Sequence, residues 1–359
     1  MTASLLLEAL FRRENEPSVT TMRRELTDNV EFFCEQQGLL AADPWFHELR
    51  TWGDAGPLLN AWVGWEQGQR EMPKDSPLVI PAHLPQPRVA FQDWLTSSVE
   101  VSSLDFRWME QLHAYDHWDV LKNTPLPPRE PLDWIVTPMP DFGSLRRWSQ
   151  FRLLHGLRTG QPLQAARDVR HLAWLMFRTD TVRGALDAGS LLRLEHEAFA
   201  ATKEPPPEWK PMSPEQVKRM EALLISSIAF SSIAAPVEVA RKARRCGEPV
   251  VTRCAALGEA ASFARYMKPL AQDAYAEGYT VLEEDIEAFP CPVSTVRMLW
   301  ERGVTIEELE PGSGRGISDL PSWMRKLSWG LVDAHLSSIV IPRATPSIRK
   351  LEDLRKKHP

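Results

Sequence analysis

Apolar residues recur every three or four positions over several stretches of the chain, which is the spacing of one face of an α-helix. Within residues 18–40 these positions are Met22, Leu26, Phe33 and Leu40. Within residues 56–71 they are Leu58, Leu59, Trp62 and Trp65. The pattern predicts a helix in each of the two stretches.

Two proline-rich stretches interrupt this helical pattern. They read MPKDSPLVIPAHLPQPR at 72–88 and TPLPPREPLDWIVTPMP at 124–140. Proline lacks a backbone N–H and clashes with the preceding turn, so neither stretch suits a regular helix. We therefore predict an N-terminal helical region with proline-rich loops over 1–140 and a C-terminal helical domain over 141–359. One continuous domain is the alternative.

Helix start and stop signals are more regular from residue 141 onward. Asp141 is a suitable N-cap for a helix that ends near Arg158, and Gly160 followed by Pro162 would close that helix and open the next. The two helices, 141–158 and 162–177, form a predicted antiparallel hairpin. Its facing sides are expected to include Trp148, Phe151, Val169 and Met176.

A capping box formed by Ser213 and Gln216 predicts a further helix over 214–235. Helical patterns continue at 249–267, 269–288, 294–302, 321–340 and 346–357. The alternation of apolar and polar residues that is typical of strands is nearly absent. The predicted fold is all-α, an irregular multi-helical array with long proline-rich connections and few or no strands.

Composition indicates a globular protein and disfavours one class of partner. The chain has 359 residues, of which 43% are hydrophobic, and a net charge of −6. A general nucleic-acid-binding protein normally carries a basic face that neutralises phosphates. We therefore predict no general nucleic-acid binding.

Cysteine usage and the N-terminus predict a cytoplasmic protein. The four cysteines, Cys34, Cys246, Cys254 and Cys291, form no C-x-x-C pair, so neither a disulfide framework nor a structural zinc site is expected. No basic residue precedes the apolar N-terminal stretch, and Glu8 interrupts it, which does not fit a signal peptide. The uncharged stretch 222–237 is shorter than the roughly 20 residues of a membrane span, so we predict a buried helix and no span there.

The 14 tryptophans are more frequent than in an average protein, and most of them precede residue 150. Clustered tryptophans occur at sugar-stacking platforms and at protein interfaces, because the indole ring gives a large contact area at low entropic cost. They also serve as core anchors for short helices and proline-rich loops. Most of these tryptophans occupy apolar positions of a helical pattern, which favours the core role.

The stretch LHAYDHWDV, residues 112–120, holds the densest group of potentially reactive side chains. His113, Asp116 and His117 form an H-x-x-D-H string, in which two histidines four residues apart on a helix have the spacing to share a metal ion. Glu195 is a conceivable distant third ligand. Aspartate is one methylene shorter than the glutamate of the H-x-x-E-H zinc pattern, which places the base differently.

A second metal-like pattern is a carboxylate three residues before a histidine, found as Glu110/His113 and Asp168/His171. Such pairs project inward in di-iron helical bundles. On a helix over 104–121, however, the histidines fall opposite the apolar stripe, and Asp168 and His171 likewise point away from the apolar side of 162–178. We therefore predict no metal and no cofactor, with His113, His117, Asp116 and Glu195 as the weak alternative.

No other motif identifies a catalytic centre. The glycine-rich PGSGRG at 311–316 has no strand before it, as a phosphate-binding loop would require, and no G-x-S-x-G nucleophile motif occurs. The sequence thus favours a non-catalytic α-helical protein that acts by macromolecular interaction, as an adaptor, assembly factor or neutralising partner of another protein. The alternative is a metal-dependent hydrolase or oxidase that uses the histidine-bearing helices 104–121 and 162–178, and a third possibility is a small-molecule binder with a tryptophan-lined pocket.

Overall fold

The computed structural model describes residues 3–65, 71–84, 93–94, 97–120, 139–179, 181–231, 238–239, 242–243 and 246. The helices predicted beyond residue 246, the glycine-rich stretch 311–316 and most of the proline-rich stretch 124–140 lie outside these residues.

Helices account for all the regular structure in the described ranges. The α-helices are α1 (Ala3–Ala41), α2 (Gly56–Trp62), α4 (Arg107–Gln111), α5 (Phe142–Arg158), α6 (Pro162–Phe177), α7 (Val182–Ala200) and α8 (Pro214–Ser231). Two 3-10 helices, η1 (Pro44–His47) and η3 (Leu112–Ala114), accompany them. The only β-type pairings within the described residues are isolated bridges, Asp54 with His117 and Trp65 with Pro140. The predicted all-α fold is confirmed.

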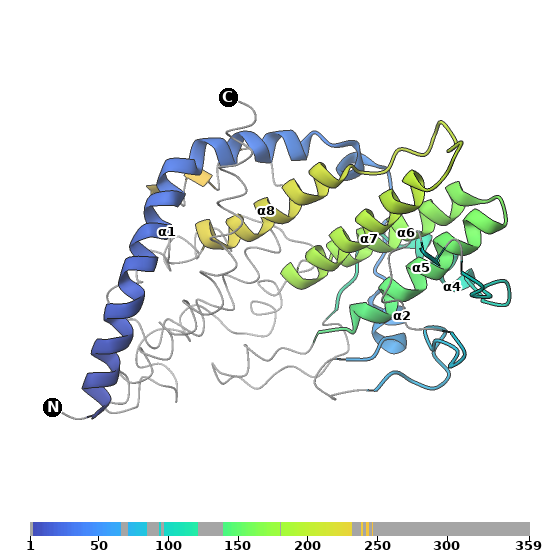
Figure 1. Cartoon of the computed structure of the whole chain (residues 1–359), viewed down its shortest axis with the longest axis horizontal. Coiled ribbons are helices and arrows are strands. Elements are labelled where there is room, and N and C mark those ends of the chain that lie inside the picture. Colours follow the sequence, from blue (N-terminus) through green and yellow to red (C-terminus); the bar gives the residue numbers. More distant parts are fainter. Residues whose placement is uncertain are drawn as a thin grey trace.

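Helices α5 to α8 lie beside one another in chain order and form the body of the described structure (Figure 1). Helix α6 packs between α5 and α7, and most of its residues are buried. The C-terminal half of α1 lies across α8, whereas its N-terminal half extends away from the bundle (Figure 1). Helix α6 is therefore the central helix of the described structure, and its side chains contact the elements around it.

The α5–α6 hairpin forms as predicted. The Asp141 carboxylate accepts a hydrogen bond from the Gly143 N–H and caps α5. Gly160 has a φ of 72°, the left-handed conformation that favours glycine after a helix end, and Pro162 opens α6. The predicted facing residues are all buried, with exposed fractions of 3% for Trp148, 0% for Phe151, 0% for Val169 and 0% for Met176.

The predicted capping box at the start of α8 is also confirmed. The Ser213 N–H donates to the Gln216 Oε1 at 2.7 Å, and the Gln216 N–H donates to the Ser213 Oγ at 3.2 Å. Each polar group therefore satisfies a backbone donor that the first helical turn leaves without a partner. Within the described part of the chain, no helix is both long and apolar enough to span a bilayer.

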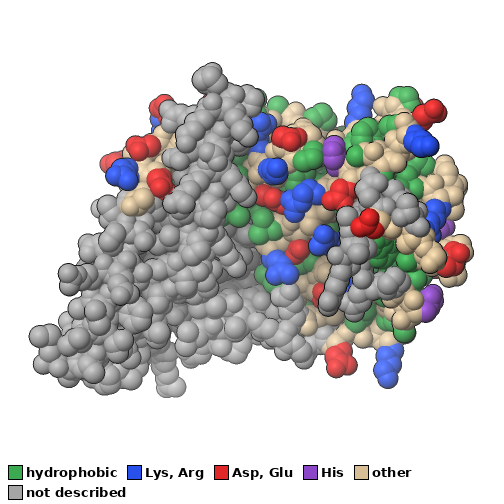
Figure 2. Space-filling view, viewed as in Figure 1, with side chains coloured by type: hydrophobic (Ala, Val, Ile, Leu, Met, Phe, Trp, Pro, Cys, Tyr) green, Lys and Arg blue, Asp and Glu red, His purple; other side chains and the backbone are tan. Residues whose placement is uncertain are grey.

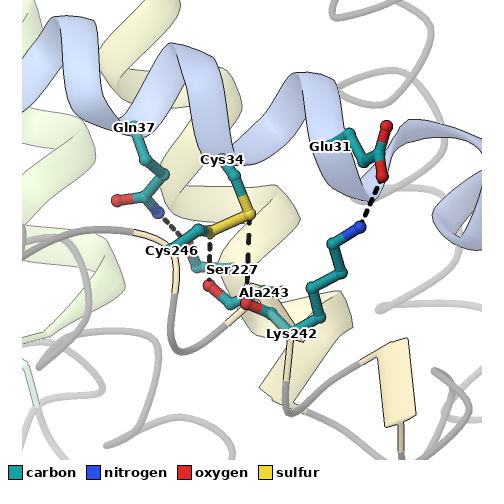
Figure 3. Close-up of a disulfide and its surroundings, with 7 residues drawn as sticks. All are labelled: Glu31, Cys34, Gln37, Ser227, Lys242, Ala243 and Cys246. Atoms are coloured by element: carbon teal, nitrogen blue, oxygen red, sulfur yellow. Dashed lines mark hydrogen bonds and ion pairs between the residues drawn. A yellow bond between two sulfur atoms is a disulfide. The ribbon is translucent and has the colours of Figure 1, made fainter.

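Helix α1 is attached to the rest of the structure by its apolar face and by a disulfide (Figure 3). Leu26, Phe33 and Leu40 are buried, as the apolar spacing predicts. Cys34 is bonded to Cys246, with 4.9 Å between their Cα atoms, and the Gln37 amide donates to the Ser227 hydroxyl beside them. This disulfide was not predicted, because sequence spacing alone does not reveal that two cysteines 212 residues apart meet in space.

One hydrophobic core contains residues from both sides of residue 140. It includes Leu59, Trp108 and Trp118 from the N-terminal region and Trp148 and Leu172 from the C-terminal region. The domain boundary near residue 140 stays a prediction.

Replacing Val169 by aspartate should lower the free energy of unfolding by several kcal/mol, because the variant buries an unpaired charge in the seam between α5 and α6. Urea unfolding followed by circular dichroism measures this loss. The matched control is Arg167→Asp, which changes an exposed position of the same helix and should have a much smaller effect. Equal losses in the two variants would show that the seam lies on another face.

Reduction of the Cys34–Cys246 disulfide should destabilise the protein, because this cross-link closes a long loop in the unfolded chain. The expected loss is roughly 2 to 5 kcal/mol, seen as a lower melting temperature with dithiothreitol than without it. A Cys34→Ser variant should melt like the reduced wild-type protein and should no longer respond to the reductant. A wild-type melting temperature that is the same with and without dithiothreitol would contradict the Cys34–Cys246 disulfide.

Candidate functional site

The chain around LHAYDHWDV does not form the predicted helix over 104–121. Helix α4 ends at Gln111, η3 ends at Ala114, and the backbone of Tyr115 is already extended. His117 instead pairs with Asp54 in an isolated bridge. His113 and His117 therefore do not share a helical face. Their spacing of four residues favours a common metal ion only on a continuous helix, which is not present here.

His113 binds a carboxylate inside the protein. Its Nε2 lies 2.9 Å from the Asp168 Oδ1, and the other Asp168 oxygen accepts a hydrogen bond of 2.7 Å from the Arg152 Nε. The Gln164 amide donates to the Oδ1 as well, at 3.0 Å. Asp168 is only 1% exposed, so the expectation that it points away from the core is wrong. The side of α6 that carries Asp168 and His171 is itself covered by the segment that contains α4 and η3.

The imidazole rings of His113 and His171 stack on each other. Their centroids are 4.6 Å apart and their planes differ by 13°. The His171 Nε2 donates to the Leu112 carbonyl at 2.9 Å, so each ring uses its Nε2 in a hydrogen bond. Burial, together with the charges of His113 and Arg50, lowers the pKa of His171 to about 4. At neutral pH the arrangement is thus a neutral imidazole packed on the histidine that contacts Asp168.

Asp116 joins the histidine segment to the loop before α2. Its Oδ1 accepts hydrogen bonds from the Gly53 N–H at 3.0 Å and from the His117 Nδ1 at 2.8 Å. The Gly53 carbonyl in turn accepts from the backbone N–H groups of Asp116 and His117. The Trp174 indole of α6 donates to the Asp116 carbonyl at 2.7 Å. Asp116 and His117 therefore fasten two loops to α6.

Glu195 belongs to a different group. It is fully buried, forms an ion pair with Arg170 and accepts a hydrogen bond of 3.0 Å from the Trp209 indole. The four residues of the metal alternative are thus divided among separate hydrogen-bonded groups. In the part of the chain that the structure describes, no set of three or more histidine, cysteine, aspartate or glutamate side chains is placed to hold a metal ion.

Arg50 connects this region to the loop of residues 48–54, called the 48–54 loop below. Its guanidinium lies over the Trp174 ring, 3.6 Å from the centroid, and donates to the carbonyl oxygens of Trp45 and Glu48 at 3.0 Å each. The side chain is only 8% exposed, and burial lowers the pKa of Arg50 to about 10. Arg50 and Trp174 were not predicted as site residues, because only the folded chain brings an arginine of this loop onto a tryptophan of α6.

The 48–54 loop presents two apolar side chains to solvent. Leu49 is 99% exposed and Trp52 is 76% exposed, although Arg50 between them is buried. The Trp52 ring lies 5.7 Å from the ring of His117. The loop thus has a fixed backbone and a free apolar surface, which we call the Leu49–Trp52 surface.

A cleft of about 520 Å³ lies on another part of the described structure. Its walls include three indole rings, and it is lined by Trp62, Pro77, Pro81, Ser103, Leu104, Asp105, Arg107, Trp108, Gln111 and Trp148. The Nε1 of Trp108 is buried and has no hydrogen-bond partner. The volume and the aromatic lining are typical of sites for small ligands.

No protein-family model, curated protein or solved structure matches the chain.

Lowering the pH should destabilise the folded protein through His171. The ordinary histidine pKa of 6.5 applies to the unfolded chain, whereas the folded value is about 4. The folded state therefore has its full stability above the unfolded-state pKa of 6.5 and loses stability as the pH falls from there to about 4. In this pH range the unfolded chain binds a proton at His171 and the folded chain does not. The expected loss is up to about 3 kcal/mol.

Urea unfolding at about pH 7 and about pH 4.5 measures this loss. The His171→Gln variant is the control, since its amide can still donate to the Leu112 carbonyl but does not titrate. Its stability should fall less than that of the wild type. An identical fall in both proteins would contradict the assignment to His171.

Proposed function

We propose that this chain is a non-catalytic binding protein that docks another protein on the Leu49–Trp52 surface. The observation that carries this proposal is the exposure of Trp52, at 76%. Eight other described tryptophans are at most 7% exposed, so their indole rings belong to the core. The Trp52 ring, in contrast, is not buried in the core. Tryptophan is enriched among the residues that contribute most of the binding energy at protein interfaces.

The backbone on both sides of Trp52 is held in place before any partner arrives. Arg50 on one side is stacked on Trp174 and bonded to two carbonyl oxygens. Gly53 on the other side exchanges hydrogen bonds with Asp116 and His117. A binding loop that is ordered in advance loses little conformational entropy on association. The ordered backbone therefore supports a docking role for the 48–54 loop and does not suit a flexible connection.

The charge distribution is consistent with a protein partner. On the described part of the face shown in Figure 2, basic and acidic side chains alternate and form no continuous basic area. Such a surface gives nucleic-acid phosphates little to bind in a general manner. The metal-dependent alternative draws no support from the described residues, since its four residues are divided among separate hydrogen-bonded groups.

The tryptophan-walled cleft supports a second candidate function, the binding of a small molecule. Three indole rings and the unpaired Trp108 N–H offer stacking surfaces and one donor. However, the Trp108 Nε1 is buried, so a ligand would reach it only after the cleft rearranges. We therefore place protein docking first.

Replacing Trp52 by alanine should weaken partner binding by about tenfold or more, as expected for a central interface tryptophan. The partner is first identified by placing a photo-crosslinking amino acid at position 52, and the affinity of the purified pair is then measured by calorimetry. The control is Val79→Ala, which shortens an apolar side chain that is 43% exposed in another segment and should leave the affinity unchanged. A crosslinked partner whose affinity ignores Trp52→Ala would contradict the docking site.

A further inference from the structure

Arg178 follows α6 directly and is only half-buried, so a group of another molecule can approach its side chain. Its Nε is buried, yet it makes no hydrogen bond, and the side chain forms no ion pair within the described ranges. Its guanidinium carbon lies 5.6 Å from the centroid of the Trp174 ring. A buried guanidinium donor without an acceptor costs free energy, so an added acceptor would be bound favourably.

Arg178 stands in a group of arginines around Trp174. Arg50 lies on the same ring at 3.6 Å, and the like charges of Arg178 and Arg170 contribute to its lowered pKa. Arg50 has Glu48 as its carboxylate partner, and Arg170 has the buried Glu195. Among the described residues, Arg178 is therefore the one arginine of this group that forms no ion pair with a carboxylate.

Two other carboxylates, those of Asp116 and Asp43, act on this group through their charge, and each is hydrogen-bonded to residues outside the group. Asp116 accepts hydrogen bonds from Gly53 and His117, and Asp43 accepts from the backbone of Trp45 and from the Gln216 amide. No described carboxylate therefore forms an ion pair with Arg178. A ligand with a single negative charge would neutralise the charge of Arg178. A carboxylate suits this position, because a guanidinium can bind it through two parallel hydrogen bonds.

The same arginine group anchors the Leu49–Trp52 surface, since Arg50 stands between these two residues in the chain. We infer that the arginines around Trp174 form a carboxylate site, in which Arg178 binds an aspartate or glutamate of the partner protein while Trp52 and Leu49 contact its apolar residues. This inference rests on the proposed docking function. The partner segment would be acidic and apolar, and its charge would complement the one unpaired cation of the group.

The test uses the full-length protein and fluorescent peptides in anisotropy titrations. One peptide alternates glutamate with leucine, the second has glutamine in place of every glutamate, and the third has phosphoserine there. We expect the glutamate peptide to bind about tenfold or more tightly than the glutamine peptide, and we expect added salt to reduce this difference. Failure of the glutamate peptide to bind better than its glutamine counterpart would overturn the carboxylate site.

Arg178→Gln should reduce the affinity for the glutamate peptide to that of the glutamine peptide. The matched control is Arg219→Gln on α8, because the Arg219 Nε is also buried without a partner but lies outside the Trp174 group. This control should bind like the wild type. Equal effects of the two variants would overturn the assignment to Arg178, and tighter, Arg178-dependent binding of the phosphoserine peptide would replace the carboxylate by a phosphate.

Trp52→Ala separates this inference from the proposed function. It should weaken both the glutamate and the glutamine peptide, because it removes the apolar contact and leaves the charge contact. If Trp52→Ala weakens binding while Arg178→Gln does not, the docking function stands and the carboxylate site fails. If only Arg178→Gln weakens binding, the Leu49–Trp52 surface is not the docking site.

Discussion

The buried carboxylate of Asp168 is the constraint on which the arrangement of the site depends. A charged group without water is tolerated only when hydrogen bonds surround it, and here the donors come from Arg152 of α5, Gln164 of α6 and His113 of η3. The carboxylate therefore fixes the 97–120 segment against the α5–α6 pair. Once η3 is in place, His113 stacks on His171, and the chain continues to Asp116, which holds the 48–54 loop through Gly53.

Local signals in the sequence predicted local features well. The cap at Asp141, the turn at Gly160 and the capping box at Ser213 each depend on residues within a few positions of one another. Such features form from short-range hydrogen bonds and backbone preferences, which need no knowledge of the tertiary structure. The apolar stripe of α1 was also predictable, because one side of that helix packs on α8.

The site could not be predicted in the same way. An apolar stripe marks one buried side of a helix, but α6 is covered on more than one side, so Asp168 is buried although it lies outside the stripe. The helical spacing of His113 and His117 was misleading because backbone pairing with the 48–54 loop replaces the helix after Ala114. The exposure of Trp52 likewise depends on which surfaces its distant neighbours leave uncovered, and no pattern along the chain records that.

The attachment of α1 has a consequence for the order in which the protein is made. Among the described helices, α8 packs on the apolar face of α1, and the cysteine that bonds to Cys34 stands at position 246, so both leave the ribosome long after α1 does. At about 5 to 20 residues per second, this helix waits roughly 10 to 40 seconds for its partners. During that time Leu26, Phe33 and Leu40 have no α8 to pack on, and the thiol of Cys34 remains free to react. During this interval the first helix of a newly made chain is therefore exposed to aggregation and to wrong thiol chemistry, and a chaperone that shields apolar segments would protect it.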